Sequence, residues 1–185
     1  MKRSTVIILC VTFVVVLVGV AIIFPMLSEK YTDENDDAAS VDISDVSSAT
    51  DFTVYNEGGK AINLSDKKGK PVVVNFWASW CVYCVKELPD FENLYREYKD
   101  RIDFMMVDLP DDRRETKSAA LKFIEQNGYS FPVYFDMNGE AANAYVESGI
   151  PVTVFIDKSG NLYYKNVGMM HESTIREYLD AMLGE

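Results

Sequence analysis

The chain has 185 residues, which fits one domain with room for additional segments. Its 18 Lys and Arg stand against 29 Asp and Glu, so the formal net charge is −11. A surface that binds nucleic acid needs clustered Lys and Arg, and no basic patch is evident beyond the first three residues. We therefore expect no nucleic-acid partner.

The N-terminal stretch is almost entirely apolar. Residues 6–24 are interrupted only by Thr12 and Gly19, and at ~1.5 Å per residue they span roughly 29 Å, about the thickness of a bilayer core. A cleaved secretory signal is the alternative, but the run is long for one and no small-x-small cleavage site follows it. We expect a short cytoplasmic segment at 1–5 and an uncleaved transmembrane signal anchor at 6–27.

The charges that flank this anchor set its orientation. Lys2 and Arg3 favour a cytoplasmic N-terminus, which places the rest of this single-pass chain on the extracytoplasmic side of the cell membrane. Cys10 lies inside the apolar run, and Leu9 breaks the pattern of small residues that a lipobox needs. We interpret Cys10 as an ordinary membrane residue, with acylation as the alternative.

The next segment, residues 28–51, is acidic. Between Tyr31 and Asp51 it carries seven Asp and Glu and no Lys or Arg, among Ala and Ser. Such a segment buries too little apolar surface to fold, and its charges repel one another. We expect a flexible linker that holds the following domain away from the membrane; an acidic partner-binding tail is the alternative.

Residues 52–185 have the patterns of an α/β domain. The run at 72–77 is apolar and β-branched early, as in a central strand buried on both faces. Apolar residues at spacings of three and four follow Cys81 and predict a helix, which Pro89 should kink. We expect strands at 52–55, 61–64, 72–77, 102–107, 131–135, 152–156 and 161–166, and helices from Cys81 to Tyr98 and at 112–127, 139–146 and 173–183.

The order of these elements predicts a mixed sheet with helices on both faces. Strands that alternate with helices require parallel pairing, whereas the turn at 157–160, with Gly160 for a positive φ, joins an antiparallel hairpin. Asp112 and Glu115 have capping-box spacing and should open the helix that Gly128 ends.

The strongest chemical signal is the pair Cys81 and Cys84. An odd total of three cysteines with one close pair does not resemble a disulfide framework. At the first turn of a helix, free backbone N–H groups and the helix dipole lower the pKa of Cys81 and favour its nucleophilic thiolate. Cys84 lies one turn deeper, so we expect Cys81 to attack a partner and Cys84 to resolve the product. Trp77 and Trp80 should form an apolar rim.

Glu87 lies three residues after Cys84 and shares a helix face with it. A partly buried carboxyl has a raised pKa and can exchange protons near neutrality, so Glu87 could carry the proton of Cys84. The alternative is a solvated helical glutamate, as we expect for Glu92 and Glu97.

Two other residues were considered for the site. Pro151 introduces the hairpin; its cis isomer is a minority state that the sequence alone cannot establish, and a trans proline at a strand start is the alternative. His171 is the only histidine, and we place it near the start of the last helix. Without a second histidine the ligand set of structural zinc is missing, so we expect no metal and no cofactor.

A family resemblance starts from the Trp-Cys-x-x-Cys-x-x-Glu-x-Pro pattern that ends at Pro89. Residues 75–89 resemble the membrane-anchored thioredoxin-like proteins of the TlpA/ResA type. The similarity continues through 131–133 and 149–153 and covers residues 52–183. It implies a thioredoxin fold with a central insertion of one strand and one helix.

The resemblance also implies roles for single residues. It makes Cys81 the attacking and Cys84 the resolving thiol of a redox-active Cys81–Cys84 disulfide. It places a cis Pro151 beside them, with Trp80 and Ile150 as neighbouring substrate-binding or structural residues. Asn75 stands where thioredoxin has a buried aspartate, and the resemblance assigns the acidic role to Glu87 instead. The list of expected site residues is therefore Cys81, Cys84, Glu87, Trp80, Ile150 and Pro151.

Val82 and Tyr83 depart from the family, because many relatives have Pro at the second position between the cysteines. These two residues help to set reduction potential and partner choice. Neither property can therefore be transferred from the family to this chain.

We expect a membrane-anchored, extracytoplasmic thiol–disulfide oxidoreductase that acts as a monomer. Its substrates would be disulfides in exported proteins, such as apocytochrome c or oxidised secreted proteins, and a membrane-embedded thiol reductant would supply electrons. The alternatives are a thiol oxidase or isomerase, a thiol peroxidase and, outside enzymes, a copper-binding metallochaperone. A non-catalytic adaptor is the weakest, because it leaves the thiol pair unexplained.

Overall fold

The structure is a computed structural model, and it describes residues 47–111 and 113–185. The expected segments 1–5 and 6–27 and most of the expected linker at 28–51 lie outside these residues. Within the described part of the chain, no helix combines the length and the apolar character needed to cross a membrane.

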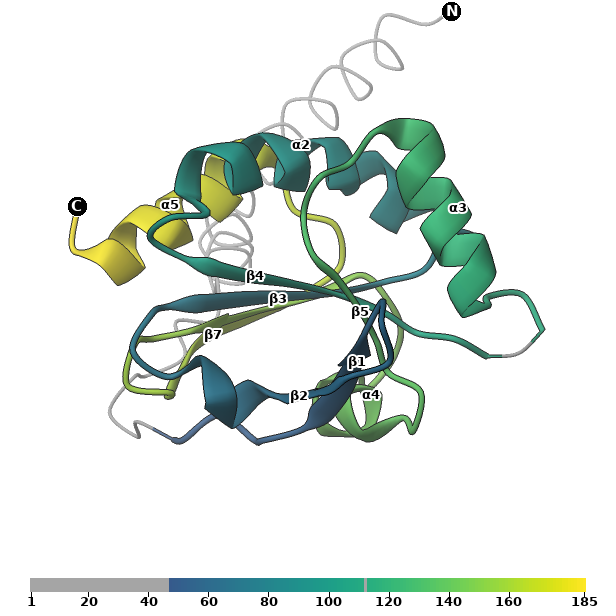
Figure 1. Cartoon of the computed structure of the whole chain (residues 1–185). Helices are drawn as coiled ribbons and strands as arrows, with labels where there is room; N and C mark the ends of the chain where they lie inside the picture. Colours follow the sequence, from purple (N-terminus) through teal and green to yellow (C-terminus); the bar gives the residue numbers. More distant parts are fainter. Residues whose placement is uncertain (1–46, 112) are drawn as a thin grey trace, which may run out of the picture. The chain divides into compact units, whose positions relative to one another are not determined.

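Seven strands form one mixed sheet in the order β2-β1-β5-β4-β3-β6-β7 (Figure 1). β3 pairs in parallel with β4, and β4 pairs in parallel with β5, whereas the other neighbours are antiparallel. The elements are β1 (Thr53–Asn56), β2 (Ala61–Asn63), the 3-10 helix η1 (Leu64–Lys67), β3 (Val72–Trp77), α2 (Val82–Tyr98), β4 (Asp103–Asp108), α3 (Lys117–Asn127), β5 (Val133–Phe135), α4 (Glu140–Tyr145), β6 (Val152–Ile156), β7 (Leu162–Val167) and α5 (Glu172–Leu183).

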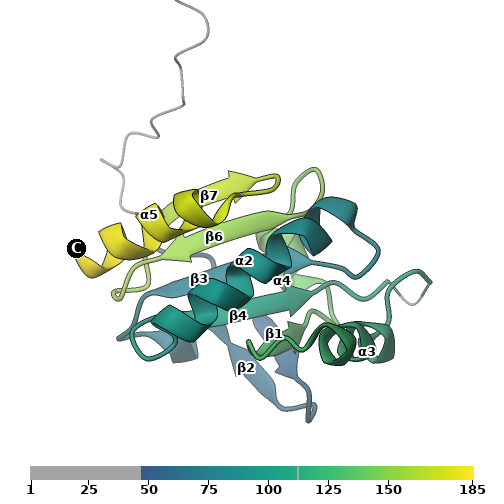
Figure 2. The same ribbon diagram turned by 90° about the horizontal axis from the view of Figure 1, so that it is seen from above.

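Helices cover both faces of the sheet, as predicted. α2, α3 and α5 lie on one face and α4 lies on the other (Figure 1). Seen from above, α2 runs over β3 and β4, while α5 lies over β6 and β7 (Figure 2). The helix α3 and strand β5 follow β4, where the family resemblance places its inserted helix and strand.

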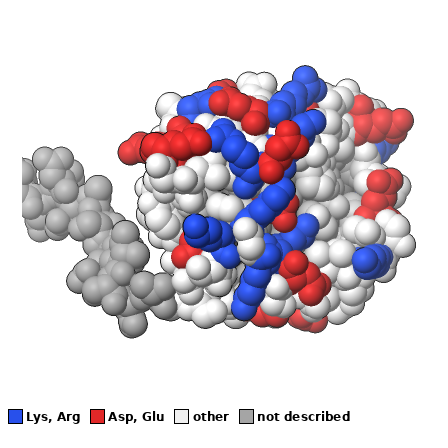
Figure 3. Space-filling view, turned by 60° about the vertical axis from the view of Figure 1, so that its left-hand side comes forward, with Lys and Arg blue, Asp and Glu red and all other residues white. Residues whose placement is uncertain are grey.

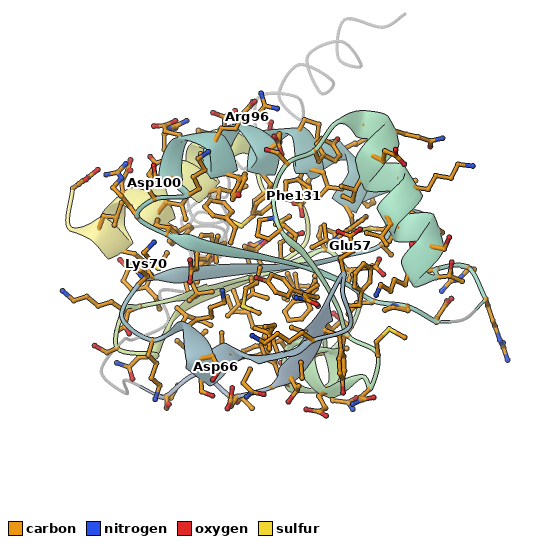
Figure 4. All side chains as sticks on the ribbon, in the orientation of Figure 1. Glu57, Asp66, Lys70, Arg96, Asp100 and Phe131 are labelled. Carbon is orange, nitrogen blue, oxygen red and sulfur yellow. A yellow bond between two sulfur atoms is a disulfide. The ribbon has the colours of Figure 1, made fainter. Side chains whose placement is uncertain are left out.

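The central strand β3 is buried along its whole length and separates two apolar layers. Val73 and Trp77 pack toward α2 and α5 in one layer, together with Phe91. Val74 packs into the other layer, on the side of α4. Side chains fill both layers in Figure 4, where Phe131 lies inside the domain and Arg96 lies at its outer edge. The predicted strand with two buried faces is therefore confirmed.

The N-terminal end of α3 differs from its prediction. The helix begins at Lys117 rather than at residue 112, and Thr116 is its N-cap, with Oγ1 accepting from the Ala119 N–H at 3.1 Å. The Asp111 carboxylate accepts from the backbone N–H groups of residues 113, 114 and 115, which therefore form a loop instead of a first helical turn. Gly128 ends α3 in the left-handed region with φ 68°, as expected.

The folded unit also begins earlier than residue 52. The Ala49 N–H donates to the Gly160 carbonyl at 3.0 Å, and the Leu162 N–H donates to the Ser47 carbonyl at 3.0 Å. The Asp51 carboxylate accepts from the Ser65 N–H at 2.9 Å. Residues 47–51, the end of the expected linker, thus lie against the domain.

Lys and Arg side chains are not spread evenly over the surface, although the sequence shows no basic cluster beyond its first three residues. On the face shown in Figure 3 they gather along a band, with Asp and Glu among them and at its edges. The sequence therefore did not reveal this band, in which acidic side chains lie among the basic ones.

Candidate active site

The two cysteines lie where β3 gives way to α2. Cys81 is the N-cap of α2, and the Cys84 N–H donates to Cys81 Sγ at 3.2 Å. They form a disulfide with an S–S distance of 2.12 Å. Cys81 is 5 % exposed, whereas Cys84 is fully buried. A reaction partner therefore meets Cys81 first, at the helix end where a thiolate is stabilised.

The loop before β6 lies against the sulfur of Cys81. The Ile150–Pro151 peptide bond is cis, and the Ile150 carbonyl oxygen is 3.6 Å from Cys81 Sγ. In the disulfide neither atom carries a proton, so this is a contact; the reduced thiol could donate to the carbonyl. The Gly168 N–H donates to the Pro151 carbonyl at 2.8 Å, which ties this loop to the end of β7.

Glu87 lies in the second turn of α2 and is 1 % exposed. Its Oε1 accepts from Asn75 Nδ2 at 2.8 Å, and its Oε2 accepts from the Met170 N–H at 3.0 Å. Burial raises the pKa of this carboxyl to about 7, against the lowering effect of the two hydrogen bonds. Glu87 therefore differs from a solvated helical glutamate, and it can change its protonation state near neutrality.

Asn75 connects Glu87 to the strand that follows Pro151. Its Nδ2 also donates to Thr153 Oγ1 at 3.1 Å, and Asn75 pairs with Thr153 in the ladder between β3 and β6. Within the described residues no hydrogen bond joins Glu87 to either sulfur. Glu87 and Cys84 lie three residues apart in α2 and so share one face of that helix.

The prediction of a solvated Glu92 is wrong. This side chain is buried, and its carboxylate accepts from the Ser130 N–H at 2.7 Å and from Ser130 Oγ at 2.6 Å. Glu97, one turn further along α2, is exposed as expected. The loop before β5 lies 38 residues away from Glu92 in the sequence, so the helix pattern alone could not reveal this contact.

An apolar surface surrounds Cys81. Trp80 is 42 %, Val82 65 % and Tyr83 62 % exposed. Val167 and Met169 are also exposed and flank Gly168, which is bonded to the Pro151 loop. Trp77, by contrast, is fully buried in the core, which corrects its expected place in the rim.

Comparison with known proteins identifies the family. The Redoxin family model matches residues 45–182. The chain belongs to the redoxin family. It is 35 % identical to the thiol-disulfide oxidoreductase ResA of Bacillus subtilis (strain 168) over 146 residues, which cover 78 % of this chain and 79 % of that protein. It is 34 % identical to ResA of Geobacillus kaustophilus over 137 residues, covering 74 % and 76 %.

Solved redoxin-like structures give the same result. A crystal structure of a putative thiol:disulfide interchange protein DsbE from Chlorobium tepidum matches with a TM-score of 0.67 and 30 % identity, covering 75 % of this chain and 96 % of that one. StoA from Bacillus subtilis matches with a TM-score of 0.61 and 27 % identity, covering 70 % and 96 %. The ResA-type resemblance, the thioredoxin-like fold and thiol–disulfide oxidoreductase activity are thus confirmed.

Two buried carboxyl groups near the cysteine pair were not expected from the sequence. Asp108, the last residue of β4, is fully buried opposite Trp77, and burial raises its pKa to about 8, with Glu115 and Asp111 adding to the rise. Glu115 is also fully buried and accepts from the N–H and from the Oγ of Ser79, each at 2.7 Å. The carboxyl ends of neighbouring parallel strands meet at one sheet edge. Asp108 directly follows the strand predicted at 102–107, so its position in the sequence already indicated a place near Cys81.

Metal ligands do not gather in the described part of the chain. It holds no group of three or more His, Cys, Asp or Glu side chains that could bind a metal ion. His171 is the N-cap residue of α5, in the position expected from the sequence.

Proposed function

We propose that this redoxin is anchored in the cell membrane by residues 6–27 and works on the extracytoplasmic side, where it reduces disulfides in exported proteins. The observation that carries the reductive chemistry is the placement of Cys81 at the N-terminus of α2, with Cys84 buried one turn below it. The basic N-terminus followed by a long apolar run supports the location.

The proposed reaction moves two electrons from the dithiol to the substrate. The Cys81 thiolate attacks one sulfur of the substrate disulfide, that S–S bond breaks, and the departing substrate thiolate takes up a proton. Cys84 then loses its proton to Glu87 and attacks Cys81 Sγ, which forms the Cys81–Cys84 disulfide and releases the second substrate sulfur as a thiolate that takes up a proton. A membrane-embedded dithiol reductant would return the pair to its reduced state.

The surface around Cys81 supports a protein as substrate. Trp80, Val82 and Tyr83 on one side of Cys81, and Val167 and Met169 beside the Pro151 loop, expose apolar groups that an extended polypeptide can cover. Apocytochrome c and oxidised secreted proteins are candidate substrates of this kind.

Trapping in cells tests both the direction and the substrate class. Full-length Cys84→Ser should accumulate mixed disulfides through Cys81, because the resolving thiol is missing, and Cys81→Ser should accumulate none. The trapped partners should be exported proteins. Equal adduct levels in the two variants, or undiminished disulfide reduction by purified Cys81→Ser, would overturn the proposed chemistry.

The location has a separate readout in the same variant. In Cys84→Ser the internal Cys81–Cys84 disulfide cannot form, and a membrane-impermeant maleimide added to intact cells lacking an outer barrier should label the fraction of Cys81 that is not held in a mixed disulfide. Labelling only after lysis would place the domain in the cytoplasm and contradict the proposal.

A further inference from the structure

The loop between β4 and α3, described at residues 109–111 and 113–116, contacts the two residues that precede Cys81. Glu115 binds Ser79, and the Arg114 guanidinium lies 4.0 Å from the centroid of the Trp80 ring. Arg114 and Glu115 are adjacent in this loop, and their partners Trp80 and Ser79 are adjacent in the turn before Cys81. The proposed thiol chemistry assigns no role to this loop.

The contact between Glu115 and Ser79 is short, double and buried. A single oxygen, Glu115 Oε2, accepts from the Ser79 N–H and from Ser79 Oγ, both at 2.7 Å. Such distances are typical of hydrogen bonds to a charged carboxylate. The Cys81 N–H donates to the Ala78 carbonyl at 3.1 Å, so Ser79 lies inside the turn that delivers Cys81 to the start of α2.

The loop that carries Glu115 is itself held in shape. Asp111 Oδ1 accepts from the N–H groups of Arg113, Arg114 and Glu115 at 2.7–3.0 Å. The Asp111 N–H donates to the Glu115 carbonyl at 3.1 Å, and Thr116 then caps α3. Glu115 therefore enters the site from a fixed backbone.

A second carboxyl lies close by and limits the charge of this cluster. Neither oxygen of Asp108, nor Oε1 of Glu115, has a hydrogen-bond partner among the described residues, and all three atoms are buried. Two unpaired negative charges in such a place would be costly, and burial keeps Asp108 protonated at neutral pH. Asp108 then adds no charge beside the contact between Glu115 and Ser79.

We propose that Glu115 is a positioning residue for thiol–disulfide exchange: its carboxylate fixes the Ala78–Cys81 turn through Ser79 and so sets the place and reactivity of the Cys81 sulfur. Glu115 touches no reacting atom. The proposal rests on exchange at Cys81, and it depends neither on the cellular substrate nor on the location of the domain.

Glu92 provides a matched control for the test. It is a second buried carboxylate that accepts from the N–H and the Oγ of a serine, Ser130, but that serine lies in the loop before β5. Glu92→Ala therefore removes a contact of the same chemistry outside the cysteine turn.

The experiment compares Glu115→Ala, Glu115→Gln and Glu92→Ala in the full-length chain. Two quantities are measured: the rate of insulin disulfide reduction by the prereduced protein, and the pH midpoint of Cys81 alkylation by iodoacetamide. Glu115→Ala should slow reduction by about tenfold or more and shift the alkylation midpoint, since small displacements of a reacting atom have large rate effects. Glu115→Gln keeps an acceptor oxygen for Ser79 and should stay within about threefold of wild type. Glu92→Ala should leave both quantities unchanged.

Three results would overturn the proposal. The first is an effect of Glu115→Ala no larger than that of Glu92→Ala. The second is an equal loss in Glu115→Gln and Glu115→Ala, since the acceptor oxygen would then not matter. If Glu115→Ala does not fold, Ser79→Ala removes the Oγ contact alone and should shift the midpoint of Cys81 alkylation. An unchanged midpoint in Ser79→Ala is the third result.

Discussion

At the scale of single residues, Glu87 shows how a carboxyl can be buried and still titrate near neutrality. Two hydrogen bonds, from Asn75 and from the Met170 N–H, favour its charged form, and desolvation favours its neutral form more strongly. The balance leaves its pKa at about 7. Asn75 cannot exchange a proton, so Glu87 is the titratable member of this pair.

Replacing Glu87 by Gln should remove this titration from the exchange reaction. General acid–base assistance contributes on the order of 10²–10⁴-fold, so we expect the resolution step near pH 7 to slow by about a hundredfold and its pH profile to lose the inflection near 7. Stopped-flow measurement of mixed-disulfide decay between pH 5 and 9 checks this. Glu97→Gln, an exposed change on the same helix, is the control. A pH profile equal to that of wild type would leave Glu87 without a role in proton transfer.

At the scale of elements, the predictions from the sequence agree with the structure where the interactions are local, and they miss contacts between residues far apart in the chain. β3 and β6 match their predicted limits to the residue, because a mostly apolar, β-branched run identifies a strand buried on both faces. Cys81, Cys84 and Glu87 share one helix, so spacing alone was sufficient to relate them. The contact of Glu115 with Ser79 spans 36 residues and forms only when β4 lies beside β3, which no local pattern encodes.

The start of α3 shows the same limit within one element. Capping-box spacing indicated residue 112, but Asp111 satisfies the following N–H groups in a loop, and the helix begins after Thr116. The family resemblance supplied what spacing could not: the position of Ile150 and Pro151 beside Cys81.

Thr116→Ala should destabilise the domain by about 1 kcal/mol, because it leaves the Ala119 N–H without its capping oxygen. Chemical denaturation of the oxidised protein measures the change in unfolding free energy. Ser118→Ala, an exposed substitution in the first turn of α3, should change it by less than about 0.5 kcal/mol. Equal values for the two variants would contradict the assignment of Thr116 as the cap.

At the scale of the whole molecule, two groups of acids respond to pH in opposite directions. Burial raises the pKa of Glu87 to about 7 and that of Asp108 to about 8. In Glu92, burial also acts to raise the pKa, but hydrogen bonds from Ser130 and Arg96 outweigh it and lower the pKa overall. Burial and hydrogen bonds act in the same way on Asp51, with Ser65 as a donor. The stability contributed by Glu92 and Asp51, whose pKa is lowered, is lost as the pH falls below about 4. The stability contributed by Glu87 and Asp108, whose pKa is raised, is lost as the pH rises from about 4 to 8.

The free energy of unfolding should therefore be greatest near pH 4 and fall toward pH 8. Over this window the native state holds protons on Glu87 and Asp108 that the unfolded chain has released, so stability decreases with pH. At ~1.4 kcal/mol per pKa unit, Glu87 alone accounts for roughly 3 kcal/mol. Asp108→Asn should flatten the decline, since the amide has no proton to lose, whereas Asp100→Asn at an exposed position should not. Urea unfolding of the oxidised wild type, Asp108→Asn and Asp100→Asn at pH 5, 6, 7 and 8 gives the slope of stability against pH for each protein. A decline of the same steepness in Asp108→Asn and wild type would show that Asp108 is already charged at pH 5.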